Sequence, residues 1–572
     1  MKFCIFAYMQ NTGLIFLCFI LCCRTQKLTP TPFHYSSQKQ ITATNGAVAC
    51  AHPLASQAGV NAMRKGGNAF DAAIATQFTL AVVYPGAGNL GGGGFMVARL
   101  QSGELLSLDF RETAPAAANK NMYLDNAGNI IEGKSIRSPT ASGVPGSVAG
   151  IIETLKYAKL PMKDLINPAI DLAENGFAIT AGEAAALNNL QSEFEKYNSG
   201  RTAFQKDIPW KEGDTLVQKD LAKTLRKIRD EGIKGFYEGE NAKLIADEVK
   251  RGDGYISGDD LKSYKVKWRK PHTFDYKGYE IVTMDLPSSG GILLHQMMKM
   301  IEQKNITSTR YLSPHAVQLM VEVERRAYAD RSEYLGDADF VKVPSKILTS
   351  DNYLEERMKD YSAGVAGKSS AVKPGKITKE SEETTHISII DKHGNAVAVT
   401  TTLNDSYGSK TVVQGAGFLL NNEMDDFSVK PGTPNLYGAI GGEANAIQPN
   451  KRMLSSMSPT IVLKNHKPVI VAGTPGGTTI PTSVFQMLLY ILDYDVTTAD
   501  AVNLPKFHHQ WLPDTVDVED NFPDSTVTAL EKMGYKIVKR GQIGRSEVIK
   551  VLDNGKFEAV ADSRGDDGAA GY

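Results

Sequence analysis

Two β-rich segments joined by one short turn constrain the fold of this chain more than any other feature. Residues 386–390 and 396–403 are rich in isoleucine, valine and threonine, which favour strands. Between them, Asp391-Lys392-His393-Gly394 has the length and the glycine of a hairpin turn. The pattern predicts a β-hairpin.

Helical patterns precede this hairpin in the chain. Residues 54–65 predict a helix that Gly66-Gly67 ends, and Asn68 can cap a second, alanine-rich helix from residue 69 to about residue 82. Long segments between residues 145 and 335 also have a helical pattern. The mixture of strands and helices predicts an α/β or α+β fold.

The domain count has two competing indications. At about 150 residues per domain, 572 residues suggest three or four domains. However, the chain has no Pro- or Ser-rich linker and no internal repeat at a period of 20 to 50 residues. Its hydrophobic content of 42% is that of an ordinary globular protein. We therefore expect one compact body.

Charge and cysteine content exclude several classes of protein. With 63 basic and 64 acidic residues the formal net charge is −1, which argues against a nucleic-acid partner. Four of the five cysteines fall within the first 23 residues, which leaves Cys50. A disulfide framework and a thiolate metal site are therefore excluded, and Cys50 is expected to be a small buried hydrophobe.

The N-terminus predicts export. Lys2, an apolar run over residues 14–21 and a polar stretch from Arg24 are typical of a secretory signal, here residues 1–24. The run has eight residues, too few for a stable transmembrane span. Cys22 and Cys23 resemble the acylated cysteine of a lipoprotein signal. A periplasmic location is favoured, with lipid anchoring or secretion as alternatives.

Several familiar catalytic motifs are absent from the sequence. The glycine-rich residues 86–94 lack the Lys-Ser/Thr ending of a phosphate loop and lead into the strand-like residues 95–98, so we expect a tight backbone crossing there. The ten histidines lack zinc-type spacing, and no Gly-x-Ser-x-Gly elbow occurs. We expect neither a metal nor another cofactor, and no serine hydrolase of the α/β type.

Small polar clusters predict a site for a small polar substrate. Thr384 opens the hairpin after an exposed, charged loop, a position where chains are often cut. The other clusters are spaced by loops, as in a preorganised site on a rigid scaffold. They are residues 400–404, 421–428, 454–459 and 473–477.

Together these motifs resemble the γ-glutamyltranspeptidases, a family of N-terminal-nucleophile hydrolases. The resemblance covers nearly all of the presumed mature chain, through residues 46–49, 52–56, 88–95, 109–112, 384–428, 450–460, 507–511 and 570–572. It implies a four-layer αββα sandwich with one core built by two autoproteolytic chains. It also implies self-cleavage between Glu383 and Thr384, giving a large subunit of residues 25–383 and a small, catalytic subunit of residues 384–572, which associate as a heterodimer.

The resemblance assigns the catalytic roles. Thr384 would be the nucleophile, and Thr402 would orient it. The backbone N–H groups of Gly476 and Gly477 would form the oxyanion hole. The freed amine of Thr384, with an ordinary pKa near about 7.7 to 8.0, would serve as the base.

The resemblance also assigns the substrate contacts. Arg111, Ser455 and Ser456 would bind the α-carboxylate of the γ-glutamyl group. Asn404, Glu423 and Asp426 would receive its α-ammonium, and Tyr437 would cover the site. Glu423 stands where some family members have glutamine, and the extra charge would favour the ammonium. Plainer alternatives are a surface ion pair of Arg111 with Asp109 or Glu112, and a packing role for Tyr437.

The implied activity is that of a γ-glutamyltransferase and glutathione hydrolase. It would pass the γ-glutamyl group to water, an amino acid or a peptide. One alternative is a related acylase that removes a glutaryl side chain from a β-lactam nucleus. Another is an exported binding protein that keeps the pocket but never matures.

Overall fold

The predicted hairpin forms the centre of a seven-stranded sheet in the computed structural model, which describes residues 31–372, 385–430 and 442–572. Its strands are β10 (Thr385–Asp391) and β11 (Ala396–Thr402), paired antiparallel with Thr385 opposite Thr401. The full strand order is β19 (Gly568–Gly571), β2 (Gly46–Cys50), β10, β11, β3 (Gly93–Arg99), β4 (Leu105–Asp109) and β7 (Lys267–Arg269).

A second seven-stranded antiparallel sheet packs against this one. Its order is β1 (Gln40–Ala43), β18 (Phe557–Ala561), β17 (Glu547–Val551), β13 (Lys467–Gly473), β12 (Thr460–Lys464), β9 (Tyr279–Thr283) and β8 (His272–Tyr276). Both sheets contain strands from before and after Thr384. The hydrophobic core is therefore shared between the two parts of the chain, and the described residues do not divide into the three or four domains suggested by length.

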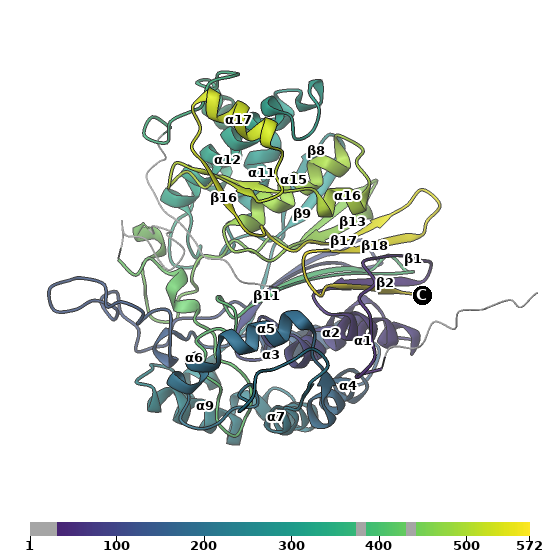
Figure 1. The fold of residues 1–572 in the computed structure, drawn as a ribbon, viewed down its shortest axis with the longest axis vertical. Coiled ribbons are helices and arrows are strands. Elements are labelled where there is room, and N and C mark those ends of the chain that lie inside the picture. Colours follow the sequence, from purple (N-terminus) through teal and green to yellow (C-terminus); the bar gives the residue numbers. More distant parts are fainter. Residues whose placement is uncertain (1–30, 373–384, 431–441) are drawn as a thin grey trace, which may run out of the picture.

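Helices cover the outer faces of the two sheets (Figure 1). One face carries α1 (Pro53–Arg64), α2 (Ala69–Val83), α3 (Ser147–Thr154), α4 (Met162–Asn175), α5 (Ala181–Asn189), α6 (Gln191–Tyr197), α7 (Lys219–Glu231), α8 (Lys234–Tyr237) and α9 (Gly239–Arg251), and α10 (Gly258–Ser263) contacts α8 and α9. The other carries α11 (Gly290–Glu302), α12 (Pro314–Tyr334), α15 (Thr479–Leu492), α16 (Thr498–Asn503) and α17 (Asp524–Met533), with the short α13 (Ser345–Leu348) and α14 (Asp351–Arg357) beside α11. The expected αββα arrangement is confirmed.

Smaller elements complete the fold. Strands β14 (Phe507–His508), β15 (Val516–Glu519) and β16 (Ile537–Arg540) form a three-stranded sheet, and β5 (Phe177–Ala178) pairs with β6 (Thr215–Leu216). The single-turn 3₁₀ helices are η1 (Pro139–Ala141), η2 (Leu155–Tyr157), η3 (Ile306–Ser308), η4 (Glu423–Asp426) and η5 (Glu443–Asn445). Of these, η4 contributes to the candidate site.

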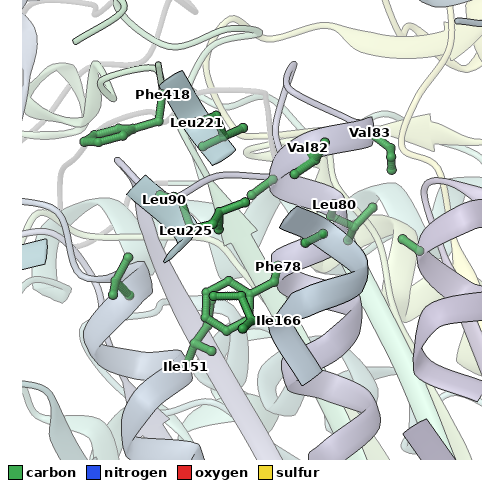
Figure 2. Packing of buried hydrophobic residues seen from close by; sticks show 14 of the residues in the cluster. Phe78, Leu80, Val82, Val83, Leu90, Ile151, Ile166, Leu221, Leu225 and Phe418 are labelled. Carbon is green, nitrogen blue, oxygen red and sulfur yellow. The ribbon is translucent and has the colours of Figure 1, made fainter. Parts of the chain in front are cut away.

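The helix predictions near the N-terminus are confirmed. Helix α1 ends at Arg64, ahead of the two glycines, and Asn68 caps α2 through bonds to the N–H groups of Phe70 and Asp71. Every residue of α2 is buried, because neighbouring helices and the sheet enclose it. Figure 2 shows Phe78 of α2 near Ile151 of α3 and Ile166 of α4. Burying each such side chain contributes about 1.5 to 3 kcal/mol.

Successive side chains of strand β10 face two different hydrophobic cores, one under the helix layer and one between the two sheets. Ile387 and Ile389 of β10 face the helix layer that contains α2, whereas Ile390 belongs to the core between the sheets. Because side chains alternate along a strand, His386 and Ser388 also face the space between the sheets. There the Ser388 hydroxyl donates to the carbonyls of Val471, 3.2 Å away, and Glu547, 2.9 Å away.

The glycine-rich run is a close backbone crossing, as predicted. A Cβ at Gly92 would lie 1.9 Å from the carbonyl oxygen of Thr402, and one at Gly91 would lie 2.1 Å from that of Leu419. No larger side chain fits at either position. The run therefore lets Gly92 and Gly93 lie directly against the end of β11, where the candidate site begins, and Gly91 against Leu419.

The remaining sequence expectations concern Cys50, the N-terminus and membrane spans. Cys50 is fully buried, as expected. The predicted signal sequence, residues 1–24, lies outside the described residues. Within the described ranges, no helix has both the length and the apolar character needed to cross a membrane.

Candidate active site

The site lies at the end of the central hairpin where β10 begins and β11 ends. Thr402 is the last residue of β11, next to the Thr401–Thr385 pair. Thr384 is the residue before β10; it lies outside the described residues, as do Glu383 and Tyr437. The other predicted site residues are all described.

Thr402 and Asn404 are held in one hydrogen-bonded turn. The Thr402 hydroxyl oxygen accepts a 2.7 Å bond from the backbone N–H of Asn404, whose φ is +75°. The Asn404 side chain donates to the carbonyl of Asn422, 3.0 Å away. Two residues predicted for different roles are thereby fixed relative to each other.

Asn89 supports the same turn and was not predicted from the sequence. Its amide donates to the Thr402 carbonyl at 2.9 Å and to the Thr401 hydroxyl at 3.2 Å. Its carbonyl oxygen accepts from Gly92 N–H at 3.0 Å and from the Ser147 hydroxyl at 2.6 Å. The sequence did carry a signal for this role, because Asn89 is the one polar side chain within the glycine-rich run. A buried amide must find hydrogen-bond partners there.

The glycine pair stands at the N-terminal end of α15. Gly476 and Gly477 have φ values of +135° and +55°, and the carbonyl of Gly476 accepts bonds from Thr479 N–H at 3.0 Å and from its hydroxyl at 2.7 Å. A Cβ at Gly476 would lie 2.4 Å from that hydroxyl oxygen. Backbone N–H groups at a helix N-terminus carry partial positive charge and suit an oxyanion.

Arg111 forms a buried ion cluster with residues from the other part of the chain. It follows β4, is 1% exposed, and its guanidinium donates to Glu423 and Asp426 of η4. It also lies 3.5 Å from the Glu112 carboxylate. The alternative of a surface ion pair is wrong in its location, because the Arg111 side chain is buried, and wrong for Asp109, whose carboxylate pairs with Arg269 and Arg452, while the pair with Glu112 is present.

The cluster holds more acidic than basic groups. Burial raises the pKa of Glu112 to about 7 and raises the pKa values of Glu423 and Asp426, while Arg111 opposes all three shifts. Among the described residues, Glu423 Oε2 and Asp426 Oδ1 have no hydrogen-bond partner. Such oxygens are suited to a cationic ligand, which would relieve the cost of burying them.

The serine pair lies against this cluster. Arg111 contacts the carbonyls of Met453 and Leu454, each 3.4 Å away, immediately before Ser455. The Ser455 hydroxyl oxygen accepts a 3.1 Å bond from Met457 N–H. The Ser456 hydroxyl oxygen accepts a 3.3 Å bond from Arg331, a residue of α12 that carries no recognisable motif. Arg111 thus contacts the chain immediately before the serine pair.

His386 lies just behind the site as a neutral ring. It is fully buried against Gly473, with Thr400 Oγ1 2.9 Å from Nδ1 and Ser388 Oγ 3.1 Å from Nε2. Burial lowers its pKa to about 3. At neutral pH the imidazole is therefore uncharged, and it contributes stability that is present above its unfolded pKa of about 6.5 and is lost as pH falls through this window toward 3.

This shift predicts a specific acid sensitivity. Between pH 7 and pH 5, charging of His386 in the unfolded chain should remove about 2 kcal/mol of folding stability. We expect His386→Asn, whose amide can still bond Thr400, to lose about 2 kcal/mol less over that interval than its parent. Denaturant unfolding of the Thr384→Ala chain at both pH values, with and without His386→Asn, measures the difference. Equal losses would contradict the neutral buried imidazole.

Comparison with known proteins identifies the family. A family model described as gamma-glutamyltranspeptidase matches residues 55–572. The chain belongs to the γ-glutamyltranspeptidase family. As a member of this family, it is an enzyme of the γ-glutamyltransferase class. A relative from Escherichia coli K12, named "Glutathione hydrolase proenzyme", is 46% identical over 537 residues, covering 93% of this chain and 93% of the relative.

Solved structures place the fold in the same superfamily. A cephalosporin acylase from Bacillus halodurans matches with a TM-score of 0.82 and 25% identity, covering 94% of this chain and 98% of the acylase. A chain of the Helicobacter pylori γ-glutamyltranspeptidase matches with a TM-score of 0.56 and 45% identity, covering 60% of this chain but 97% of that one. The γ-glutamyltranspeptidase is thus closer in sequence, and its matched chain corresponds to only part of this precursor.

The described residues of this family member contain no group of three or more His, Cys, Asp or Glu side chains placed to hold a metal ion. The site chemistry that the structure does present consists of hydroxyls, one glycine turn and the Arg111 ion cluster.

Proposed function

We propose that this γ-glutamyltranspeptidase cleaves itself between Glu383 and Thr384 and then hydrolyses or transfers the γ-glutamyl group of glutathione-type compounds. The two products are residues 25–383 and a small subunit of 189 residues, which remain together as a heterodimer. The observation that carries the substrate assignment is the buried cluster of Arg111, Glu423 and Asp426. Strands from both products in each sheet support the heterodimer.

Self-cleavage needs only groups of the precursor and one water molecule. The Thr384 hydroxyl attacks the carbonyl carbon of Glu383, and the acyl group passes from nitrogen to oxygen. Water then hydrolyses the ester, which leaves a carboxylate on Glu383 and an α-amine on Thr384. This amine has an ordinary pKa near about 7.7 to 8.0, so part of the enzyme has it unprotonated at neutral pH.

Turnover repeats the same chemistry on the substrate. The Thr384 amine takes the proton of its own hydroxyl, whose oxygen attacks the γ-amide carbon. The N–H groups of Gly476 and Gly477 receive the negative oxygen, and Thr402 orients the nucleophile. The amine leaving group departs with a proton, and water or the amine of an amino acid or peptide then takes the γ-glutamyl group from the ester. Removing one such oxyanion donor typically costs about 2.7 to 4 kcal/mol of transition-state stabilisation.

The ion cluster suits a substrate that carries both an α-carboxylate and an α-ammonium. Arg111 bonds one oxygen of Glu423 and one oxygen of Asp426 directly. A γ-glutamyl group would insert between them, its α-carboxylate on Arg111, Ser455 and Ser456 and its α-ammonium on Glu423, Asp426 and Asn404. Each buried charge then exchanges one partner for another, so insertion leaves none unpaired. Tyr437 is proposed to cover the bound group.

Export completes the proposal. Residues 1–24 would direct the precursor to the periplasm, with lipid anchoring at Cys22 or Cys23 or secretion as the alternatives. Sequencing the N-termini of both purified bands locates the mature start and tests Thr384 at once. A single full-length band would contradict an active enzyme and support the non-maturing binding protein.

A pair of substrates separates the proposed activity from the acylase alternative. γ-Glutamyl-p-nitroanilide and glutaryl-p-nitroanilide differ only in the α-ammonium group. Because an unpaired carboxylate cluster is costly, we expect kcat/KM at least about 100-fold higher for the glutamyl compound. Glu423→Gln should narrow this preference by lowering only the glutamyl value. A preference for glutaryl in the parent enzyme would overturn the substrate assignment.

A further inference from the structure

Helix α12 brings a second buried arginine to the serine pair. Arg331 is 2% exposed, and its Nε donates to the Ser289 hydroxyl at 2.9 Å while its Nη2 donates to the Ser456 hydroxyl at 3.3 Å. Ser289 in turn donates both its N–H and its hydroxyl to the Ser455 carbonyl, each at 2.7 Å. One guanidinium therefore holds both serines, directly in one case and through Ser289 in the other.

These contacts set the direction of the serine hydroxyls. A carboxylate only accepts hydrogen bonds, so a carboxylate site needs donors. Ser456 uses a lone pair to accept from Arg331, and Ser455 uses one to accept from Met457 N–H. A hydroxyl that accepts from a cation is also polarised into a stronger donor. Arg331 thus favours the donor orientation of the Ser456 hydroxyl directly, and through Ser289 it holds the backbone of Ser455.

The charge of Arg331 reaches the neighbouring cluster. It lowers the pKa of Asp426, against the larger effect of burial, which raises it. The carboxylate end of the site therefore lies in the field of two guanidinium groups, Arg111 next to the chain before the serine pair and Arg331 at the Ser456 hydroxyl. An arginine suits this position because its planar fork can hold two hydroxyls while it keeps its charge.

We propose that Arg331 is a positioning residue that determines specificity for the α-carboxylate of the substrate, through Ser455 and Ser456. The inference rests on the proposed γ-glutamyl activity. It assigns to α12 a role in substrate selection that the site motifs do not contain.

A residue one turn earlier on α12 provides an internal contrast. The Tyr328 hydroxyl donates to the carbonyl of Thr478, which follows the glycine pair. Tyr328 thus supports the oxyanion end of the site, whereas Arg331 supports the carboxylate end. Tyr328→Phe should lower kcat for every substrate to a similar extent, and Arg331 variants should act mainly on KM for substrates with an α-carboxylate.

The test compares two anilides that differ only in that carboxylate, γ-glutamyl-p-nitroanilide and 4-aminobutyryl-p-nitroanilide. We expect Arg331→Met to lower kcat/KM for the glutamyl compound about tenfold, chiefly through KM, with less than about a twofold change for the 4-aminobutyryl compound. Arg331→Lys keeps the charge but not the fork, and Ser289→Ala removes one anchor. Each should reduce the discrimination ratio, kcat/KM for the glutamyl compound divided by kcat/KM for the 4-aminobutyryl compound, by about threefold. These two variants therefore still test the inference if Arg331→Met does not fold.

Rates are normalised to the amount of small subunit present, so that poor maturation is not counted as poor binding. Arg326→Lys is the matched control, because Arg326 is as deeply buried on the same helix but pairs with Glu322 and Asp360. It should leave the ratio unchanged. Parallel losses on both anilides, or an unchanged ratio in all Arg331 and Ser289 variants, would overturn the inference. Failure of the parent enzyme to turn over either anilide would instead defeat the proposed function.

Discussion

Replacing Thr384 with alanine should abolish both self-cleavage and turnover. The substitution removes the only hydroxyl proposed to attack Glu383 and, later, the γ-amide, and the α-amine is never released. Loss of a nucleophile of this kind costs at least about a thousandfold in rate. A denaturing gel should show one full-length band in place of two, and γ-glutamyl-p-nitroanilide turnover should fall to background.

The neighbouring threonine provides the matched control. Thr385 is fully buried, its side chain faces away from the site on the opposite face of β10, and its hydroxyl has no partner among the described residues. Thr385→Val keeps the shape and removes an unsatisfied polar group, so it should process and turn over normally with equal or higher stability. If Thr384→Ala still yields two bands, the nucleophile is misassigned.

Replacing Arg111 with methionine should disable both ends of the substrate site. The substrate α-carboxylate loses the Arg111 guanidinium as its partner. Removing one partner of a buried ion pair typically costs about 3 to 5 kcal/mol. Because Arg111 lowers the pKa values of Glu423 and Asp426, these groups should then bind protons more tightly and attract the α-ammonium less. We therefore expect kcat/KM for γ-glutamyl-p-nitroanilide to fall by about 100-fold or more.

A substrate without the α-carboxylate separates the loss of carboxylate binding from the loss of ammonium binding. Arg111→Met should weaken 4-aminobutyryl-p-nitroanilide, which lacks the carboxylate, much more than Arg331→Met does, because Arg111 bonds both Glu423 and Asp426 whereas Arg331 acts on Asp426 through its charge. Arg99→Lys serves as control, because Arg99 is a mostly buried arginine at the far end of β3 that bonds the carbonyls of His466 and Gly394. Comparable loss in Arg99→Lys, or near-normal kcat/KM in Arg111→Met, would contradict the assigned role of Arg111.

Local patterns were sufficient for much of the fold. Helices α1 and α2, their glycine stop and Asn68 cap, and the hairpin of β10 and β11 follow from residue spacing because they depend on neighbours within a few positions. The glycine-rich run was predicted as a crossing for the same reason, although its partner, the end of β11, was not identified. The order of the two sheets follows from no local pattern, since β10 pairs with β2 more than 300 residues away.

The residues of the candidate site also fall into those that local patterns predicted and those that they did not. Arg111, Glu423 and Asp426 were predicted to bind opposite ends of a ligand, and the structure shows Arg111 bonded to both carboxylates. Asn89 and Arg331 were missed. Asn89 had a weak signal within the glycine run, but Arg331 is one charged residue among many on a long helix.

The sequence by itself determined the family, the hairpin that opens with Thr384 and the chemical types of the site residues, because motifs and short-range spacing encode these directly. The tertiary structure alone decided which charges meet and which helix stands behind the serine pair. Those contacts join positions 125 to 315 residues apart. They exist only because two stacked sheets, each built from both parts of the chain, bring β4, η4 and α12 to the same end of one hairpin.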